Sequence, residues 1–137
     1  MHTLTAGSNG QVAHRRYRVL AVDDDPMILR TARRLLSEDC DVVTAESTTA
    51  ALDLLFGGQR FDVILSDVWM PGADGDGMSL FARVHEVAPL QASRIVYMTA
   101  GGLPDRLSRF IASRTVIAKP LVVEDVLAAF ERVTGAR

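Results

Sequence analysis

The feature that most constrains this chain is its alternation between two kinds of hydrophobic pattern. Five short runs rich in β-branched residues occupy 19–22, 41–44, 61–65, 94–98 and 115–118. The stretches that follow them carry apolar residues three and four positions apart, which is the spacing of a helix with one buried face. Alternating strands and helices indicate parallel strands joined by right-handed crossovers. We therefore predict an α/β fold.

The first and third runs are the most continuously apolar, which predicts central strands buried on both faces. This suits the strand order 2-1-3-4-5, so we expect a five-stranded parallel sheet with five helices, a (βα)5 flavodoxin-like sandwich of three layers. Asp25-Pro26 and Pro104-Asp105 are typical helix starts, and Gly57-Gly58 is a typical helix end. The expected apolar helix faces are Ile28, Ala32, Leu35 and Leu36; Ala51, Leu54 and Leu55; Leu80, Phe81, Val84 and Val87; Leu107, Phe110 and Ile111, the weakest; and Val123, Val126, Leu127 and Phe130.

Length and composition exclude several classes of protein. With 137 residues and 48% hydrophobic residues, the chain fits one globular domain, which we place at 17–134 after a disordered leader at 1–16. A net charge of −2 argues against direct nucleic-acid binding, and no apolar run is long enough to cross a membrane or to form a secretory signal. The single cysteine, Cys40, excludes an internal disulfide framework. We therefore expect a cytoplasmic protein.

Polar side chains follow four of the predicted strands. Asp23 to Asp25 follow the first strand, Asp67 the third, Thr99 the fourth and Lys119 the fifth. In an open parallel sheet the ligand site lies beyond the carboxyl ends of the strands, where these side chains would meet. Clustered carboxylates repel one another unless a cation neutralises them, and a few hard oxygen ligands suit Mg²⁺. Each motif alone is common in turns, but the ordered set predicts a magnesium and phosphate site.

At these positions the chain resembles the receiver domains of two-component response regulators. The matching stretches are 19–26, the segment Asp67-Val68-Trp69-Met70-Pro71-Gly72-Ala73-Asp74-Gly75, then Met98-Thr99-Ala100, and finally Ala118-Lys119-Pro120. The resemblance extends over about 17–134. The expected strand order is that of a chemotaxis receiver, and the stretch from 94 to 120 looks most like the receiver modules of hybrid histidine kinases.

The resemblance implies a role for each site residue. Asp67 would be the phospho-acceptor, a carboxylate nucleophile that forms an acyl phosphate. Asp24 would bind Mg²⁺ directly, Asp23 largely through water, and the backbone carbonyl of Trp69 would be a further ligand alongside Asp67. Lys119, in a cis Lys119-Pro120 bond, would pair with the phosphoryl oxygens, and the Thr99 hydroxyl would turn toward them. The donor would be a sensor histidine kinase or a phosphotransfer protein, and a downstream effector, not identified by the sequence, would receive the signal. Such a protein is not an enzyme beyond self-dephosphorylation.

Three features depart from the family pattern. The position three before Lys119, usually aromatic in receivers, is Val116. The loop at 74–77 looks about two residues longer than is common, because Gly77-Met78-Ser79-Leu80 also fits the usual start of the third helix. Gly101-Gly102 follows Thr99-Ala100 and loosens the backbone there. We therefore predict intact phosphorylation chemistry with a switch that is not built on an aromatic residue of the fifth strand.

Other functions fit the sequence less well. A pseudo-receiver that docks partners without phosphorylation needs none of the complete acid, hydroxyl and ammonium set. A Mg²⁺-dependent aspartyl-phosphate phosphatase needs a second acid two residues beyond the nucleophile, where Trp69 stands. A calcium-binding EF-hand loop at 74–85 lacks the acids required at Met78 and His85. The sequence leaves open whether the chain is a stand-alone receiver or one module of a larger protein.

Overall fold

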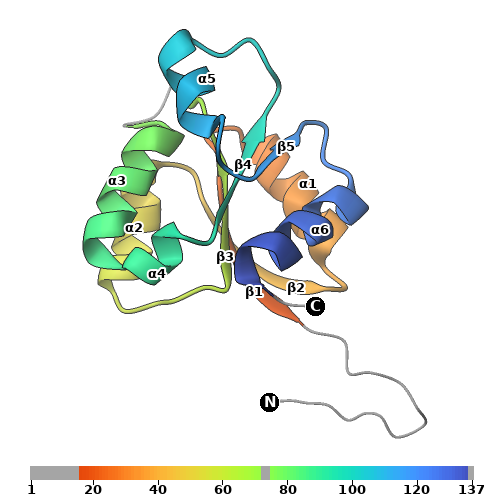
Figure 1. Ribbon diagram of the computed structural model, residues 1–137. Coiled ribbons are helices and arrows are strands. Elements are labelled where there is room, and N and C mark those ends of the chain that lie inside the picture. Colours follow the sequence, from red (N-terminus) through yellow and green to blue (C-terminus); the bar gives the residue numbers. More distant parts are fainter. Residues whose placement is uncertain (1–15, 72–74, 136–137) are drawn as a thin grey trace, which may run out of the picture.

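The computed structural model describes residues 16–71 and 75–135, and within them the chain forms one parallel sheet. The strands are β1 (Tyr17–Val22), β2 (Cys40–Ala45), β3 (Val63–Asp67), β4 (Ile95–Thr99) and β5 (Val116–Ala118). Their order is β2-β1-β3-β4-β5, with every pair parallel (Figure 1). This confirms the predicted fold and strand order. The expected leader lies outside the described residues except for Arg16, which pairs with Asp41 and so belongs to the fold.

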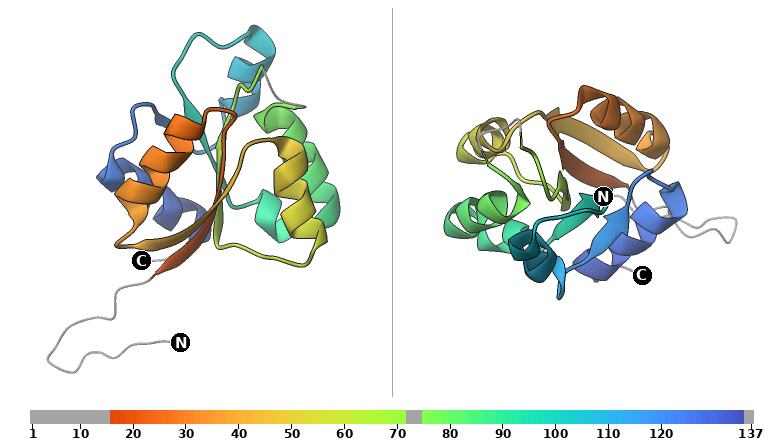
Figure 2. Two further views of the ribbon diagram at one scale, coloured as in Figure 1. Left: turned by 180° about the vertical axis from the view of Figure 1, so that it is seen from behind. Right: turned by 90° about the horizontal axis from the view of Figure 1, so that it is seen from above.

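Helices cover both faces of this sheet. They are α1 (Pro26–Leu36), α2 (Thr48–Phe56), α3 (Gly77–Val87), α4 (Pro89–Ala92), α5 (Asp105–Ile111) and α6 (Val123–Thr134). Figures 1 and 2 show α1 and α6 on one face and α2, α3 and α4 on the other, with α5 near the carboxyl end of β4. None of the helices in the described part of the chain is both long and apolar enough to cross a membrane.

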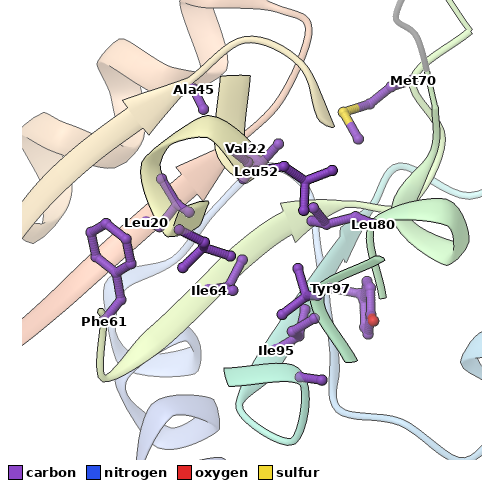
Figure 3. Packing of buried hydrophobic residues seen from close by; sticks show 14 of the residues in the cluster. Leu20, Val22, Ala45, Leu52, Phe61, Ile64, Met70, Leu80, Ile95 and Tyr97 are labelled. Carbon is purple, nitrogen blue, oxygen red and sulfur yellow. The ribbon is translucent and has the colours of Figure 1, made fainter. Parts of the chain in front are cut away.

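The core has two parts because side chains alternate across the sheet. Leu20, Ile64 and Tyr97 pack with α2 and α3 in one cluster (Figure 3), whereas Val19 and Val96 pack with α6 in the other. Neighbouring positions of the same strands therefore serve opposite layers. Burial on both faces explains why β1 and β3 read as continuous apolar runs.

The structure corrects the sequence prediction in two places. It has a sixth helix, the single turn α4, where Pro89 stands at the first helical position and the Gln91 amide pairs with both backbone groups of Phe61. In α1 the buried positions are Leu29, Ala32 and Leu36, while Ile28 is only partly buried. The buried face is therefore centred one residue later than the spacing suggested.

Candidate functional site: an acidic cluster with one lysine

Three carboxylates meet at the carboxyl edge of the sheet, where β1 and β3 end side by side. Asp23 and Asp24 follow Val22, the last residue of β1, and Asp67 is the last residue of β3. Val22 is in register with Ser66, so the two strands bring the acids to the same level. One carboxylate oxygen of each acid lies within 4.8 Å of the others. The predicted convergence of these three residues is present in the structure.

Lys119 reaches this cluster from the end of β5. Its Nζ lies 2.9 Å from Oδ2 of Asp23, to which it donates a hydrogen bond, and 3.4 Å from Oδ1 of Asp67. The Lys119-Pro120 peptide bond is cis, as expected. Lys119 is also the only lysine in the chain, since the other 14 basic residues counted as Lys or Arg are arginines. The ammonium group of Lys119 therefore interacts with carboxylates at the ends of both β1 and β3.

Burial makes the charges in this cluster costly. Asp23 is 1% exposed and Asp67 7% exposed. Burial and the charge of Asp23 together raise the pKa of Asp67 to about 6, although Lys119 opposes the shift. Burial also raises the pKa of Asp23. Burial opposes charge on Lys119, but its contacts with the two acids outweigh that effect and raise its pKa. The site thus holds one ammonium and favours a further cation.

Asp25, the third acid of the Asp23-Asp24-Asp25 run, has a different task. Its side chain accepts a hydrogen bond from the backbone N–H of Met27 and caps α1. Its own N–H donates to Oδ1 of Asp23, which fixes the orientation of that carboxylate. The sequence motif therefore separates into two residues aimed at the cluster and one that begins the helix.

Thr99 and Trp69 stand at the border of the cluster. Thr99 ends β4, and its hydroxyl accepts a hydrogen bond from the N–H of Gly101, so in this structure it is engaged with the following loop. Trp69 is exposed, two residues past Asp67. Both residues lie beyond the same sheet edge as the acids. Their proposed contacts with a phosphoryl group or a metal ion remain predictions.

The backbone after Asp67 is held closely against α3. Gly77 donates its N–H to the carbonyl of Val68 at 2.8 Å. A Cβ at Gly77 would lie 2.9 Å from the carbonyl oxygen of Asp67 and 3.0 Å from Cα of Val68, so only glycine fits. The first residue of α3 therefore packs directly against the segment that carries the candidate nucleophile.

An ion pair that the sequence did not reveal joins α3 to α5. Asp76 is nearly buried and caps α3 by accepting from the N–H of Ser79. Its Oδ2 lies 2.9 Å from Nη1 of Arg106 in the first turn of α5. These interactions lower the pKa of Asp76 although burial opposes them. The two residues are thirty positions apart and belong to no common motif, so no sequence signal indicated the pair.

The donor set fits a small hard cation. Three carboxylates supply oxygen ligands, and no histidine or cysteine takes part in the cluster. Mg²⁺ is usually held by one or two protein carboxylates, waters and phosphate oxygens, which matches a cluster at an open edge of a sheet. The arrangement can therefore hold a divalent cation beside a carboxylate nucleophile.

These features define a class of protein: a doubly wound α/β domain with an acidic, lysine-containing site at its strand ends. The response regulator receiver domain family matches residues 19–131 of the chain. The rice (Oryza sativa subsp. japonica) two-component response regulator ORR6 is 34% identical over 122 residues, which cover 85% of this chain and 71% of that protein. The Escherichia coli K12 transcriptional regulatory protein GlrR is 37% identical over 99 residues, covering 71% of this chain but only 21% of that protein.

Solved structures agree with this assignment. A response regulator receiver domain protein from Clostridium thermocellum has a TM-score of 0.72 at 25% identity, covering 86% of this chain and 94% of that one. The signal receiver domain of an HD domain-containing protein from Pseudomonas fluorescens Pf-5 has a TM-score of 0.73 at 26% identity, covering 92% and 91%. The chain belongs to the response regulator receiver domain family. Members of this family are generally phosphoryl acceptors that bind Mg²⁺ in an acidic pocket and interact with histidine kinases and effectors.

The three departures from the family pattern can be located. Val116 is the first residue of β5 and is partly buried against the core. Gly101 and Gly102 have φ angles of +89° and +67°, a conformation that favours glycine. The loop at 74–77 lies partly outside the described residues, but α3 begins at Gly77 as expected.

Proposed function

We propose that Asp67 accepts a phosphoryl group from the phosphohistidine of a sensor histidine kinase or a phosphotransfer protein. The observation that carries this proposal is the position of Asp67, which lies 3.4 Å from the only lysine and within 4.8 Å of two further carboxylates. A buried carboxylate held between a cation site and an ammonium group is suited to attack phosphorus, because phosphoryl transfer depends on positioning and charge neutralisation.

The transfer is a displacement at phosphorus. A carboxylate oxygen of Asp67 forms a bond to phosphorus while the bond from phosphorus to the histidine ring nitrogen breaks. The electron pair of that bond leaves with the imidazole, which needs no further oxidant or cofactor. The product is an aspartyl phosphate, and water attack on its phosphorus would return the carboxylate and inorganic phosphate, so that the protein acts at most on its own phosphoryl group.

Lys119 and Thr99 have different parts in this scheme. In the present structure Lys119 neutralises Asp23 and Asp67, and after transfer its ammonium pairs with a phosphoryl oxygen. The Thr99 hydroxyl leaves the N–H of Gly101 and donates to another phosphoryl oxygen. Breaking the Thr99 contact frees the glycine pair, which connects the chemistry to the segment before α5.

Asp23, Asp24, Asp67 and the backbone carbonyl of Trp69 would hold Mg²⁺. When bound, the ion neutralises the acids and the phosphoryl oxygens, which otherwise repel one another. We expect Asp24 to contribute more to metal affinity than Asp23, because Asp23 is already paired with Lys119.

Phosphorylation by a small donor tests the proposal. The full chain with Mg²⁺ and acetyl phosphate should gain one phosphoryl group, measured by intact mass, and the group should be released by hydroxylamine. Asp67→Asn should abolish the gain, because an amide cannot act as the nucleophile, while Asp53→Asn, which changes an exposed acid on α2, should leave it intact. Full incorporation by Asp67→Asn would contradict the assignment. No incorporation by the unaltered chain would favour the pseudo-receiver that docks partners without phosphorylation.

Metal binding has a separate test. Mg²⁺ should raise the melting temperature of the unphosphorylated protein, since a ligand that binds only the folded state stabilises it. It should also change the fluorescence of Trp69, the only tryptophan. Asp24→Asn should remove most of both effects, whereas Asp25→Ser, which can still cap α1, should retain them. Equal Mg²⁺ responses in both variants would contradict the ligand assignment.

A further inference from the structure

A cavity of about 220 Å³ lies away from the acidic site, beside the first half of β4. Its apolar walls come from Phe81 of α3, Ala92 of α4 and Ile95 of β4. Its rim includes the exposed residues Ser113 and Arg114 of the segment between α5 and β5. The cavity is therefore open to solvent on one side and apolar on the other.

One residue that lines this cavity carries a buried polar group with no partner among the described residues. Tyr97 is 1% exposed, and its hydroxyl makes no hydrogen bond with the described residues. In Figure 3 its ring stands at the edge of the core cluster, with the hydroxyl oxygen pointing away from Ile64. A buried hydroxyl normally has a partner, because leaving it unpaired forfeits the hydrogen bond that it makes in water. Tyr97 is among the residues that line the cavity, so a donor without an acceptor belongs to this site.

A second donor is fixed beside the first. The Arg114 guanidinium lies over the ring of Phe81 at 4.4 Å and over that of Phe110 at 4.1 Å. Among the described residues it has neither a hydrogen-bond acceptor nor an acidic partner. Tyr97 and Arg114 both line the cavity, and the charge of Arg114 opposes the rise that burial causes in the pKa of Tyr97. Two hydrogen-bond donors, one of them charged, therefore meet at the cavity without an acceptor.

We propose that this cavity binds a small monocarboxylate with a compact apolar body, whose carboxylate accepts hydrogen bonds from Tyr97 and Arg114. The carboxylate would supply the two acceptor oxygens that the donors lack, and a charge-assisted pair with arginine is the stronger of the two interactions. The apolar body would lie against Phe81, Ala92 and Ile95. A cation would be repelled by Arg114, and a ligand without an acceptor would leave the buried hydroxyl unpaired.

The volume suits a ligand of about the size of benzoate. An apolar cavity of about 150 Å³ is enough to hold benzene, so 220 Å³ leaves room for one ring or a branched aliphatic chain and a carboxylate. The site shares no residue with the acidic cluster, although Tyr97 lies on the same strand as Thr99. Binding here therefore does not require phosphorylation of Asp67.

Titration of the full-length, ¹⁵N-labelled protein with sodium benzoate tests the proposal by two-dimensional NMR. We expect saturable shifts in the amides of 93–97 and 113–115. Tyr97→Phe removes only the hydroxyl, Arg114→Gln removes the guanidinium with its charge and its contacts to Phe81 and Phe110, and each should weaken binding about tenfold. Arg109→Gln, which changes an exposed arginine of α5 outside the cavity, should bind benzoate like the unaltered protein.

Neutral benzamide and cyclohexanecarboxylate separate the contributions of charge and ring. Benzamide should bind more weakly than benzoate, and cyclohexanecarboxylate should bind comparably if the apolar body matters only by its volume. Shifts that do not saturate, or that centre on Lys119, would overturn the proposal. So would equal benzoate affinity in the unaltered protein, Tyr97→Phe and Arg114→Gln, which would mean that the phenol bonds only to an ordered water.

Discussion

The acidic cluster and the segment from Thr99 to Ile111 lie at the same edge of the sheet but are held in place very differently. Asp67 is part of a central strand, and its neighbours in β1 and β3 are fully buried. The other segment contains two glycines with positive φ, and α5 has Leu107 as its buried residue, whereas α6 buries Val126, Ala129 and Phe130. The core strands therefore hold the acidic side chains in place, whereas few buried contacts hold the segment from Thr99 to Ile111 in one position.

Removing the side chain of Lys119 should disrupt the acidic cluster, the rigid region of this comparison, more than any other substitution considered. We expect its effect on the rate of phosphorylation to be the largest. Lys119→Ala should slow phosphorylation by acetyl phosphate by roughly 10²-fold, because the ammonium that neutralises the acids and the incoming phosphoryl group is lost. Lys119→Arg retains the charge with a different shape, so its rate of phosphorylation should lie between those of Lys119→Ala and the unaltered protein. Intact-mass time courses measure all three rates. A Lys119→Ala rate equal to that of the unaltered chain would show that the ammonium has no part in transfer.

The charge stored in the cluster should appear as a pH dependence of stability. The pKa of Asp67 in the folded protein, about 6, lies above its ordinary value of 3.8, so the folded state binds this proton more tightly than the unfolded state. Without metal, the free energy of unfolding should therefore fall by about 3 kcal/mol as pH rises from about 3 to about 7, with most of the fall between the two pKa values. Asp67→Asn should remove most of this slope and be the more stable protein at neutral pH.

Urea unfolding in the presence of a chelator, repeated across this pH range, measures the slope. Asp53→Asn is the matched control, because Asp53 is an exposed acid on α2. If the free energy of unfolding of Asp67→Asn varied with pH as it does in the unaltered protein, burial would not raise the pKa of Asp67. That result would weaken the contrast between the two regions.

Substitutions in the segment from Thr99 to Ile111 should have smaller effects, on stability and on hydrogen exchange. Gly102→Ala introduces a side chain at φ +67° and should cost about 1 kcal/mol of stability. Mg²⁺ with beryllofluoride, a phosphoryl mimic, should change hydrogen exchange mainly in 99–113, and Gly102→Ala should reduce that change. Gly58→Ala, at φ +95° after α2, should cost similar stability without altering exchange near α5. Exchange changes confined to α1 and α6, with 99–113 silent, would place the switch elsewhere.

The same comparison explains what the sequence could predict. The strands followed from hydrophobic periodicity, because burial on one or two faces imposes a pattern that needs no knowledge of the partners. Their order followed from the continuously apolar first and third runs, which suit the central places in a known open-sheet arrangement. Asp23, Asp24, Asp67 and Lys119 could be placed together because each directly follows or ends a strand of a parallel sheet. The features that the sheet determines could therefore be predicted from the sequence alone.

Features that depend on particular side-chain pairs could not be predicted in this way. The Asp76–Arg106 ion pair joins residues at the starts of two different helices. The hydrophobic pattern of the sequence does not show that these two positions are close in space. The turn α4 is only four residues long, too short for a helical repeat to show. The unpaired hydroxyl of Tyr97 was also hidden, because a tyrosine in an apolar strand has the same pattern whether or not its oxygen finds a partner. These features gather around α3, α4 and α5, on one side of the molecule.

The most direct test of the central claim, that Asp67 carries the phosphoryl group, is to trap and map it. Borohydride reduces an aspartyl phosphate to homoserine, which changes the mass of one residue permanently. The full chain should be phosphorylated in the presence of Mg²⁺, reduced, digested and sequenced by tandem mass spectrometry. We predict homoserine at position 67, and aspartate at positions 23 and 24. Homoserine at either of those two positions, with Asp67 unchanged, would contradict the account.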